Sequence, residues 1–173
     1  MCGIFGVLNK KNPVVLKDLN TLSESMFYRG PDDKGIVNSS NWAIGMVRLS
    51  IIDLEGGHQP ISNQEEDIHL VANGEIYNFK ELREDLIKLG YIFKTKSDVE
   101  VILHLYQEYG YEGIHKLNGM FAFAIYDEKK GSLWIARDRL GIKPLYFINQ
   151  DDCFAFSSEL IGLSRVFKSN LCK

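Results

Sequence analysis

The 173-residue sequence predicts an α+β fold with largely antiparallel sheets. Its β-rich segments lie toward both ends of the chain, and its clearest helix patterns lie between them. A doubly wound parallel sheet would instead alternate strands and helices along the whole chain. The composition fits one globular domain over residues 1–173, because 45% of the residues are hydrophobic and 25% are charged.

The N-terminal part of the chain is predicted to form a buried strand and then a helix. Residues 3–9 are a short apolar run that fits a strand beginning almost at the terminus. Pro13 suits a first helical turn, and apolar residues recur at helical spacing from Leu16 to Met26. The helix is expected to stop at residues 29–32. After a loop, further strands are expected at residues 42–48 and 68–72.

Two helices are predicted in the middle of the chain from capping patterns followed by apolar stripes. Asn78 and Glu81 have the spacing of an N-terminal capping box, and Ser97 and Glu100 repeat it. The predicted helices span residues 78–90 and 98–109, and the segments that follow are strands at 120–126, 132–137, 145–148 and 153–156 and a short helix near residue 159.

Charge and composition argue against several classes of partner. The net charge of −3 offers no positive field for a phosphate backbone or an anionic bilayer. The sequence has neither an apolar run of membrane-spanning length nor a signal-peptide pattern, so we expect a cytoplasmic protein. Its three cysteines and four histidines lack metal-ligand spacing, so no metal site is predicted. We therefore expect neither nucleic acid nor a membrane as a partner.

Cys2 directly follows the initiator methionine and is a candidate nucleophile. Removal of Met1 would place a thiol and a free α-amine on the same residue. The amine can accept the thiol proton or, when charged, favour the thiolate. A small apolar residue that opens a strand is an alternative role for a cysteine at this position, so other residues must decide.

Asn73, Gly74, Arg48 and Asp98 supply groups that an amino-acid substrate would need. Asn73 and Gly74 are expected in a strand-end loop rather than a hairpin, because residues 75–78 lead into a helix. Such a loop can direct a side-chain amide and a backbone N–H at one oxyanion. Arg48 can grip a carboxylate and Asp98 an ammonium group, although a surface cation and a helix-dipole carboxylate also fit the sequence.

Seven sequence blocks run through the chain in a fixed order, at residues 1–6, 29–32, 48–53, 73–78, 97–102, 119–124 and 137–146. Together these blocks resemble the glutamine-hydrolysing domain of class II glutamine amidotransferases. The asparagine synthetase branch fits better than the sugar-phosphate branch, which usually has Arg-Trp at the position of Arg48-Leu49. The Asn-Gly-Glu-Ile-Tyr-Asn block beginning at Asn73 agrees with that choice.

The resemblance implies an N-terminal-nucleophile hydrolase fold, a four-layer αββα sandwich with two stacked antiparallel sheets. It implies that Cys2 attacks the side-chain amide of L-glutamine, that its α-amine transfers protons, and that Asn73 and the Gly74 N–H bind the oxyanion. Arg48 would bind the substrate α-carboxylate. The other residues that the resemblance implies are Glu75 and Asp98 at the α-amino end, Leu49, Ser50, Ile51 and Ile52 along one wall, and Arg29 and Gly30 in a mobile loop over the site.

Synthetases of this branch continue into an ATP-pyrophosphatase domain, whose phosphate loop is absent from this sequence. The resemblance therefore implies no cofactor in this chain, with ATP and Mg needed only in a missing synthetase domain or a partner. We expect an excised glutaminase domain or a separate subunit, with a docking surface around the last strands and the turn at residues 137–145. Two departures from the family pattern, Tyr28 in place of a histidine and the absence of a lysine after Glu159, remove no catalytic group.

Two alternatives to an active glutaminase stay open from the sequence. One is a catalytically silent interaction or regulatory domain, which retention of Met1 would support because the α-amine would then be blocked. The other is an N-terminal-nucleophile hydrolase that acts on a different amide.

Overall fold

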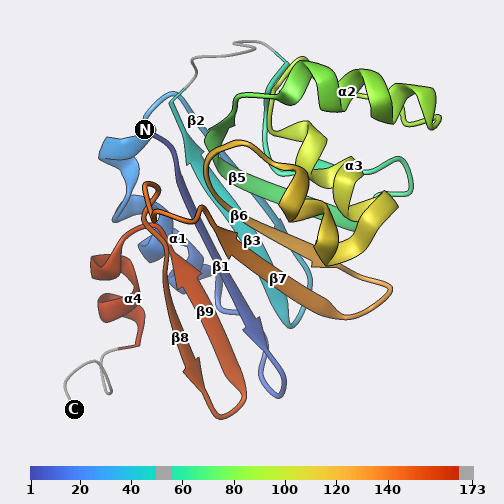
Figure 1. Ribbon diagram of the computed structural model, residues 1–173. Helices are drawn as coiled ribbons and strands as arrows, with labels where there is room; N and C mark the ends of the chain where they lie inside the picture. The colour runs from blue at the N-terminus through green and yellow to red at the C-terminus, as the bar shows by residue number, and fades with distance from the viewer. Residues whose placement is uncertain (50–55, 168–173) are drawn as a thin grey trace.

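Two antiparallel sheets stack against each other in the computed structural model, which describes residues 1–49 and 56–167 (Figure 1). The five-stranded sheet has the order β2-β3-β1-β9-β8, and the four-stranded sheet has the order β4-β5-β6-β7. The first sheet comprises β1 (Gly3–Asn9), β2 (Asp33–Asn38), β3 (Trp42–Arg48), β8 (Tyr146–Gln150) and β9 (Cys153–Ser157). The second comprises β4 (Ile61–Ser62), β5 (Ile68–Ile76), β6 (Gly119–Asp127) and β7 (Ser132–Arg137).

Helices cover the outer face of each sheet. Figure 1 shows α1 (Leu16–Glu24) and α4 (Leu160–Val166) beside the five-stranded sheet, and α2 (Phe79–Lys88) and α3 (Glu100–Tyr109) beside the four-stranded sheet. Two 3₁₀ helices, at Phe27–Arg29 and Gly110–Lys116, follow α1 and α3. No helix in the described part of the chain is both long enough and apolar enough to span a bilayer.

The core has three layers, because side chains alternate between the two faces of each central strand. In β1, Ile4 packs into the layer between the sheets, whereas Phe5 and Val7 pack under α1 and α4. In β5, Val71 faces the same inter-sheet layer, whereas Leu70 packs against the layer under α2 and α3. This arrangement confirms the predicted α+β class and the four-layer αββα sandwich.

The predicted strands near both ends of the chain are confirmed, and those at residues 42–48 and 132–137 have the observed bounds. The expected loop after β1 and α1 contains the strand β2, which the sequence did not reveal. Its sequence, Asp-Lys-Gly-Ile-Val-Asn, has no clear apolar alternation, because β2 is a half-exposed edge strand.

The prediction of a strand-end loop at Asn73 and Gly74 is wrong. Both residues lie inside β5, directly opposite Ala122 and Phe121 of β6. A side chain at Gly74 would meet the backbone of β6, since an added Cβ would lie 2.6 Å from the carbonyl oxygen of Met120. The glycine therefore permits close strand pairing rather than a turn.

Neither predicted capping box forms. No side-chain cap bond is present at either helix, although α2 and α3 begin within two residues of their predicted starts. Asn78 instead bridges to the 116–118 segment, and the Glu100 carboxylate turns back to accept from the backbone of Lys94 and Thr95. Backbone donors and acceptors from neighbouring loops therefore replace the local partners that the spacing predicted.

Candidate active site

A cavity of about 520 Å³ lies where β1, β3 and β5 meet the beginning of α3. Seven residues that the sequence singled out line this cavity, although they come from four separate segments of the chain. They are Cys2, Arg48, Leu49, Asn73, Gly74, Glu75 and Asp98. The predicted wall residues Ser50, Ile51 and Ile52 lie outside the described residues.

Cys2 lies immediately before β1 and packs against the inter-sheet core. Its Sγ is 3.6 Å from the carbonyl oxygen of Leu49, and its own carbonyl oxygen accepts a 3.0 Å hydrogen bond from Nε of Arg29. Arg29 in turn forms an ion pair with Glu159 at the start of α4. The thiol-bearing segment is therefore held at the cavity by a buried arginine.

The side chain of Asn73 faces the sheet that carries Cys2. Alternation along β5 places it on the same face as Val71, which packs in the inter-sheet layer. Its Nδ2 is buried and has no hydrogen-bond partner within the described part of the chain. An orphaned amide donor that is 2% exposed is costly unless a ligand satisfies it.

The N–H of Gly74 points away from β6, toward the open edge of β5. Phe121, its opposite residue, uses its N–H and its carbonyl oxygen to contact Asp138, so these two opposed residues do not bond each other. Along the open edge, Gln59 holds both backbone groups of Ala72, and the Asp98 carboxylate accepts from the N–H of Ile76 at 2.7 Å. The Gly74 amide lies between these two side-chain contacts and faces the cavity.

Asp98 is a buried carboxylate on the open edge of β5, at Ile76, whereas Gln59 contacts the same edge at Ala72. Its side chain is 4% exposed, and burial raises its pKa above the ordinary value, with a further contribution from the charge of Glu75. Hydrogen bonds from backbone N–H groups, including that of Ile76, oppose the shift without cancelling it. Such a group favours a cationic ligand, which would stabilise the charged form of the carboxylate.

Arg48 supplies a buried cation at the end of β3. It is 5% exposed, lies opposite Asp33 of β2, and its carbonyl oxygen accepts from the N–H of Asp32. Arg48 and Asp98 thus bring opposite charges to the wall of one cavity, while Glu75 is exposed at its rim. A zwitterionic amino acid is complementary to this pair.

Arg29 and Gly30 are buried beside the cavity and are not among the residues that line it. Gly30 packs against the backbone of β3, where an added Cβ would lie 2.5 Å from the nitrogen of Arg48. Four further residues line the cavity without having been predicted from the sequence: Gln59, Met120, Ile142 and Lys143. The last three lie in the sequence blocks 119–124 and 137–146, but only the fold shows that these blocks reach the cavity.

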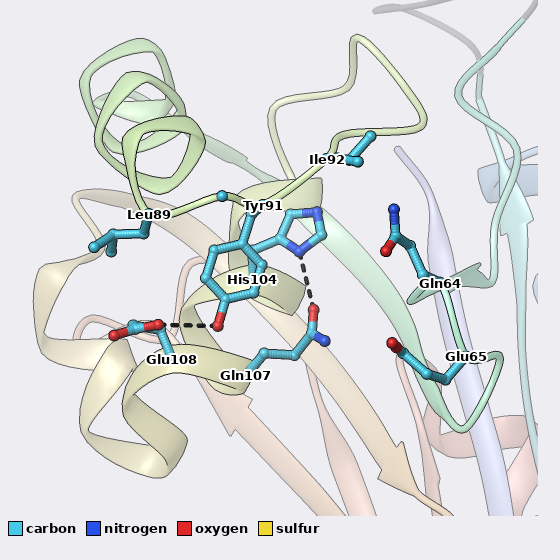
Figure 2. A pocket seen from close by; sticks show the side chains of 9 residues that line it. Gln64, Glu65, Leu89, Tyr91, Ile92, His104, Gln107 and Glu108 are labelled. Carbon is cyan, nitrogen blue, oxygen red and sulfur yellow. Dashed lines mark hydrogen bonds between the residues drawn. The ribbon is translucent and has the colours of Figure 1, made fainter.

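A second, smaller cavity of about 210 Å³ lies beside α3 (Figure 2). There the Tyr91 hydroxyl donates to Glu108, and Nδ1 of His104 lies 3.0 Å from Oε1 of Gln107. Burial and the Glu108 carboxylate raise the pKa of Tyr91 to about 12. None of the predicted site residues lines this cavity, so we assign the chemistry to the larger one.

The stacked sheets, with Cys2 and the Asn73–Gly74 pair at one cavity, are features of an N-terminal-nucleophile amidotransferase. The chain matches the family described as "Glutamine amidotransferase domain" over residues 1–171, and it belongs to that family. The solved structure of glutamine phosphoribosylpyrophosphate amidotransferase from Bacillus subtilis, complexed with ADP and GMP, superposes with a TM-score of 0.81 at 25% identity. That match covers 96% of this chain and 44% of the other.

The curated relatives include glutamine-hydrolysing asparagine synthetases. The chain is 49% identical to asparagine synthetase B of Escherichia coli (strain K12), over 84% of this chain and 26% of the relative. It is 44% identical to asparagine synthetase 1 of Bacillus subtilis (strain 168), over 92% of this chain and 26% of the relative. The chain therefore spans only about a quarter of the length of these two relatives.

Proposed function

We propose that this chain hydrolyses the side-chain amide of L-glutamine through a glutamyl thioester on Cys2. The observation that carries this proposal is the convergence of Cys2, Asn73, Arg48 and Asp98 on one cavity, together with the unsatisfied Nδ2 of Asn73. Each group matches one part of the substrate, and sequence-distant segments supply them.

In the first half-reaction, the Cys2 thiolate attacks the amide carbon of glutamine and a carbon–sulfur bond forms. Asn73 Nδ2 and the Gly74 N–H donate to the oxyanion of the tetrahedral intermediate. Removal of Met1 leaves the nitrogen of Cys2 as an α-amine, which takes the thiol proton and passes it to the departing nitrogen. The carbon–nitrogen bond breaks, and ammonia leaves a thioester behind.

In the second half-reaction, water replaces the sulfur. The same α-amine accepts a proton from the attacking water, the Asn73 and Gly74 donors again hold the oxyanion, and the carbon–sulfur bond breaks. Glutamate leaves, and the thiol recovers its proton. These steps require no cofactor in this chain, and we place any need for ATP and Mg in a synthetase portion.

The other end of glutamine is bound by charge. Arg48 binds the α-carboxylate with its planar fork of donors, and Asp98 with Glu75 binds the α-ammonium group. Leu49 lines the wall next to Cys2. Movement of Arg29 and Gly30 over bound glutamine stays a prediction.

We propose that the ammonia is consumed by an ATP-pyrophosphatase domain or subunit, in an asparagine-synthetase-like reaction in the cytoplasm. Apolar side chains are exposed around the last strands and the preceding turn, including Leu140, Ile142 and Phe147. This is the face where we expect the partner to dock. Cross-linking that places the partner on α2 instead would contradict it.

Glutamate release by the purified chain tests the proposed function. We expect glutamate and ammonia in equal amounts, a covalent adduct on Cys2 with a thiol-directed glutamine analogue, and no activity after Cys2→Ala. Mass determination of the N-terminus should show that Met1 is absent from the active protein. A chain that lacks Met1 but releases no glutamate would support the silent interaction domain.

A further inference from the structure

We infer that Gln59 is a positioning residue that clamps the two sheets together at the catalytic edge. The inference rests on the proposed function, because it concerns how the oxyanion donors are held opposite the nucleophile. Cys2 belongs to the segment that enters the five-stranded sheet, whereas Asn73 and Gly74 belong to the four-stranded sheet. Their relative position therefore depends on how the two sheets are fixed to each other.

The side chain of Gln59 binds β5 at two points. Its Oε1 accepts from the N–H of Ala72 at 2.7 Å, and its Nε2 donates to the carbonyl oxygen of Ala72 at 3.2 Å. Gln59 is 8% exposed, so both contacts are shielded from water. The short strand β4 pairs with β5 only at Leu70 and His69. At Ala72, the side chain of Gln59 makes the hydrogen bonds to β5 that a neighbouring strand would otherwise make.

The backbone around Gln59 packs against β2 of the other sheet. The carbonyl oxygen of Gln59 lies so close to Gly35 of β2 that an added Cβ there would be 1.8 Å away. The preceding residue, His58, places its Nδ1 2.7 Å from Oδ2 of Asp33, which is also in β2. Gln59 thus connects β2 of the five-stranded sheet to the residue directly before Asn73.

This connection has a consequence for the geometry of the oxyanion site. Catalytic donors must be held to within about 0.5 Å of their productive position. Hydrophobic contacts between the sheets are not directional, so they do not by themselves fix the position of β5 relative to the five-stranded sheet. The carboxamide of Gln59 is directional, and it fixes the backbone groups of Ala72, one residue from Asn73 and two from Gly74.

Steady-state kinetics of Gln59→Leu test the clamp, with Gln64→Leu as the matched control. Gln64 is exposed and lies at the smaller cavity of Figure 2. We expect kcat per titrated active site to fall about 10- to 100-fold in Gln59→Leu, because the oxyanion donors are displaced. The KM for glutamine should change less than about threefold, since Arg48 and Asp98 are untouched. The control should match the wild type.

Two further measurements separate positioning from a general loss of fold. The Ala72 amide should exchange with solvent faster in Gln59→Leu, whereas the Asn73 amide, which faces β6, should not. In an Asn73→Ala background, Gln59→Leu should lower kcat by a smaller factor than in the wild-type background, because one of the two oxyanion donors that Gln59 positions has been removed and only the Gly74 N–H remains. If Gln59→Leu does not fold, Gln59→Glu keeps the volume and puts a carboxylate oxygen in place of the donor to Ala72.

The outcomes distinguish this inference from the proposed function. A wild-type chain without glutaminase activity would contradict the proposed function itself. An active wild type together with unchanged kcat in Gln59→Leu and Gln59→Glu would overturn the clamp alone. Equal losses of kcat in the presence and absence of Asn73 would also overturn it.

Discussion

In the proposed reaction, Asn73 carries a polar group that contributes to chemistry at the expense of stability. Its buried Nδ2 has no partner among the described residues, so the folded chain bears the cost of removing it from water. A site that is ready to bind an oxyanion must leave such a donor unsatisfied until substrate arrives. The same logic applies to the buried carboxylate of Asp98.

We predict that Asn73→Ala lowers kcat about 100-fold or more, with little change in KM, because one oxyanion donor is lost. The melting temperature should stay unchanged or rise, because no hydrogen bond is removed with Nδ2. Asn78→Ala is the matched control. It removes two hydrogen bonds, to the carbonyl of Lys116 and from the N–H of Asn118, and should lower stability without lowering kcat. Unchanged turnover in Asn73→Ala would remove Asn73 from the oxyanion site.

For Asp98 we predict a pH dependence of glutamine affinity in the inactive Cys2→Ala background. Burial raises the pKa of Asp98, and only the ionised form binds the α-ammonium group. Affinity should therefore fall as the pH falls through this raised pKa. Asp98→Asn should bind about 10- to 100-fold more weakly at pH 7 and should show no such dependence. Calorimetric titration between pH 4 and 8 measures both effects.

The stability of the ligand-free protein should change in the opposite direction. A carboxyl with a raised pKa binds its proton more tightly in the folded chain than in the unfolded one, so ionisation costs stability as the pH rises. Asp98→Asn should therefore increase the melting temperature at pH 7. The gain should disappear below about pH 3.9, where Asp98 is protonated in both states. A lower melting temperature at pH 7 would contradict this reading of the burial.

At the scale of elements, the sequence predicted where strands and helices occur better than how they end. Apolar patterns located β3 and β7 within their observed bounds, whereas β2, which is as long as β7, has no clear apolar alternation. The predictions of a loop at Asn73–Gly74 and of two capping boxes were wrong for one shared reason. Turn and capping rules describe an isolated segment of chain. In the folded protein, β6 pairs with Asn73 and Gly74, the 116–118 segment binds Asn78, and the 94–95 backbone binds Glu100.

Asp138 holds the loop that closes one side of the cavity. Burial alone would raise its pKa, but N–H groups of Ile142, Lys143, Phe121 and Leu140 outweigh that effect and hold the pKa below its ordinary value. The stabilisation is therefore present above about pH 3.9 and is lost as the pH falls through the lowered pKa.

We predict that Asp138→Ala costs at least about 3 kcal/mol at pH 7, because several buried N–H groups lose a charged acceptor. The difference from the wild type should shrink as the pH falls below about 4. Asp85→Asn, in an exposed pair with Lys88, is the control and should leave the free energy of unfolding nearly unchanged. Urea denaturation at pH 7 and pH 3 measures these differences. Equal effects of both substitutions at pH 7 would contradict the assignment.

At the scale of the whole molecule, the site depends on contacts that no local pattern contains. The sequence supplied the candidate groups, and the resemblance supplied their roles, but only the stacked sheets bring Cys2 and Asn73 to one cavity. Gln59 had no sequence signal of its own. Its two partners, Ala72 and Gly35, lie 13 and 24 positions away on different sheets, so only the folded chain identifies it.

Glycine substitutions can distinguish a contact between the sheets from a local backbone preference. Gly35→Ala would drive a Cβ into the carbonyl of Gln59, and we expect it to cost about 1–3 kcal/mol of stability and to lower kcat as well. Gly131, in the turn between β6 and β7, has a φ of 58° and open space around it, so Gly131→Ala should cost about 1 kcal/mol and leave kcat unchanged. Thermal unfolding and glutaminase kinetics on both variants separate the two effects. If kcat survives in a folded Gly35→Ala variant, the spacing between the sheets at β2 is not what aligns the nucleophile with its oxyanion donors.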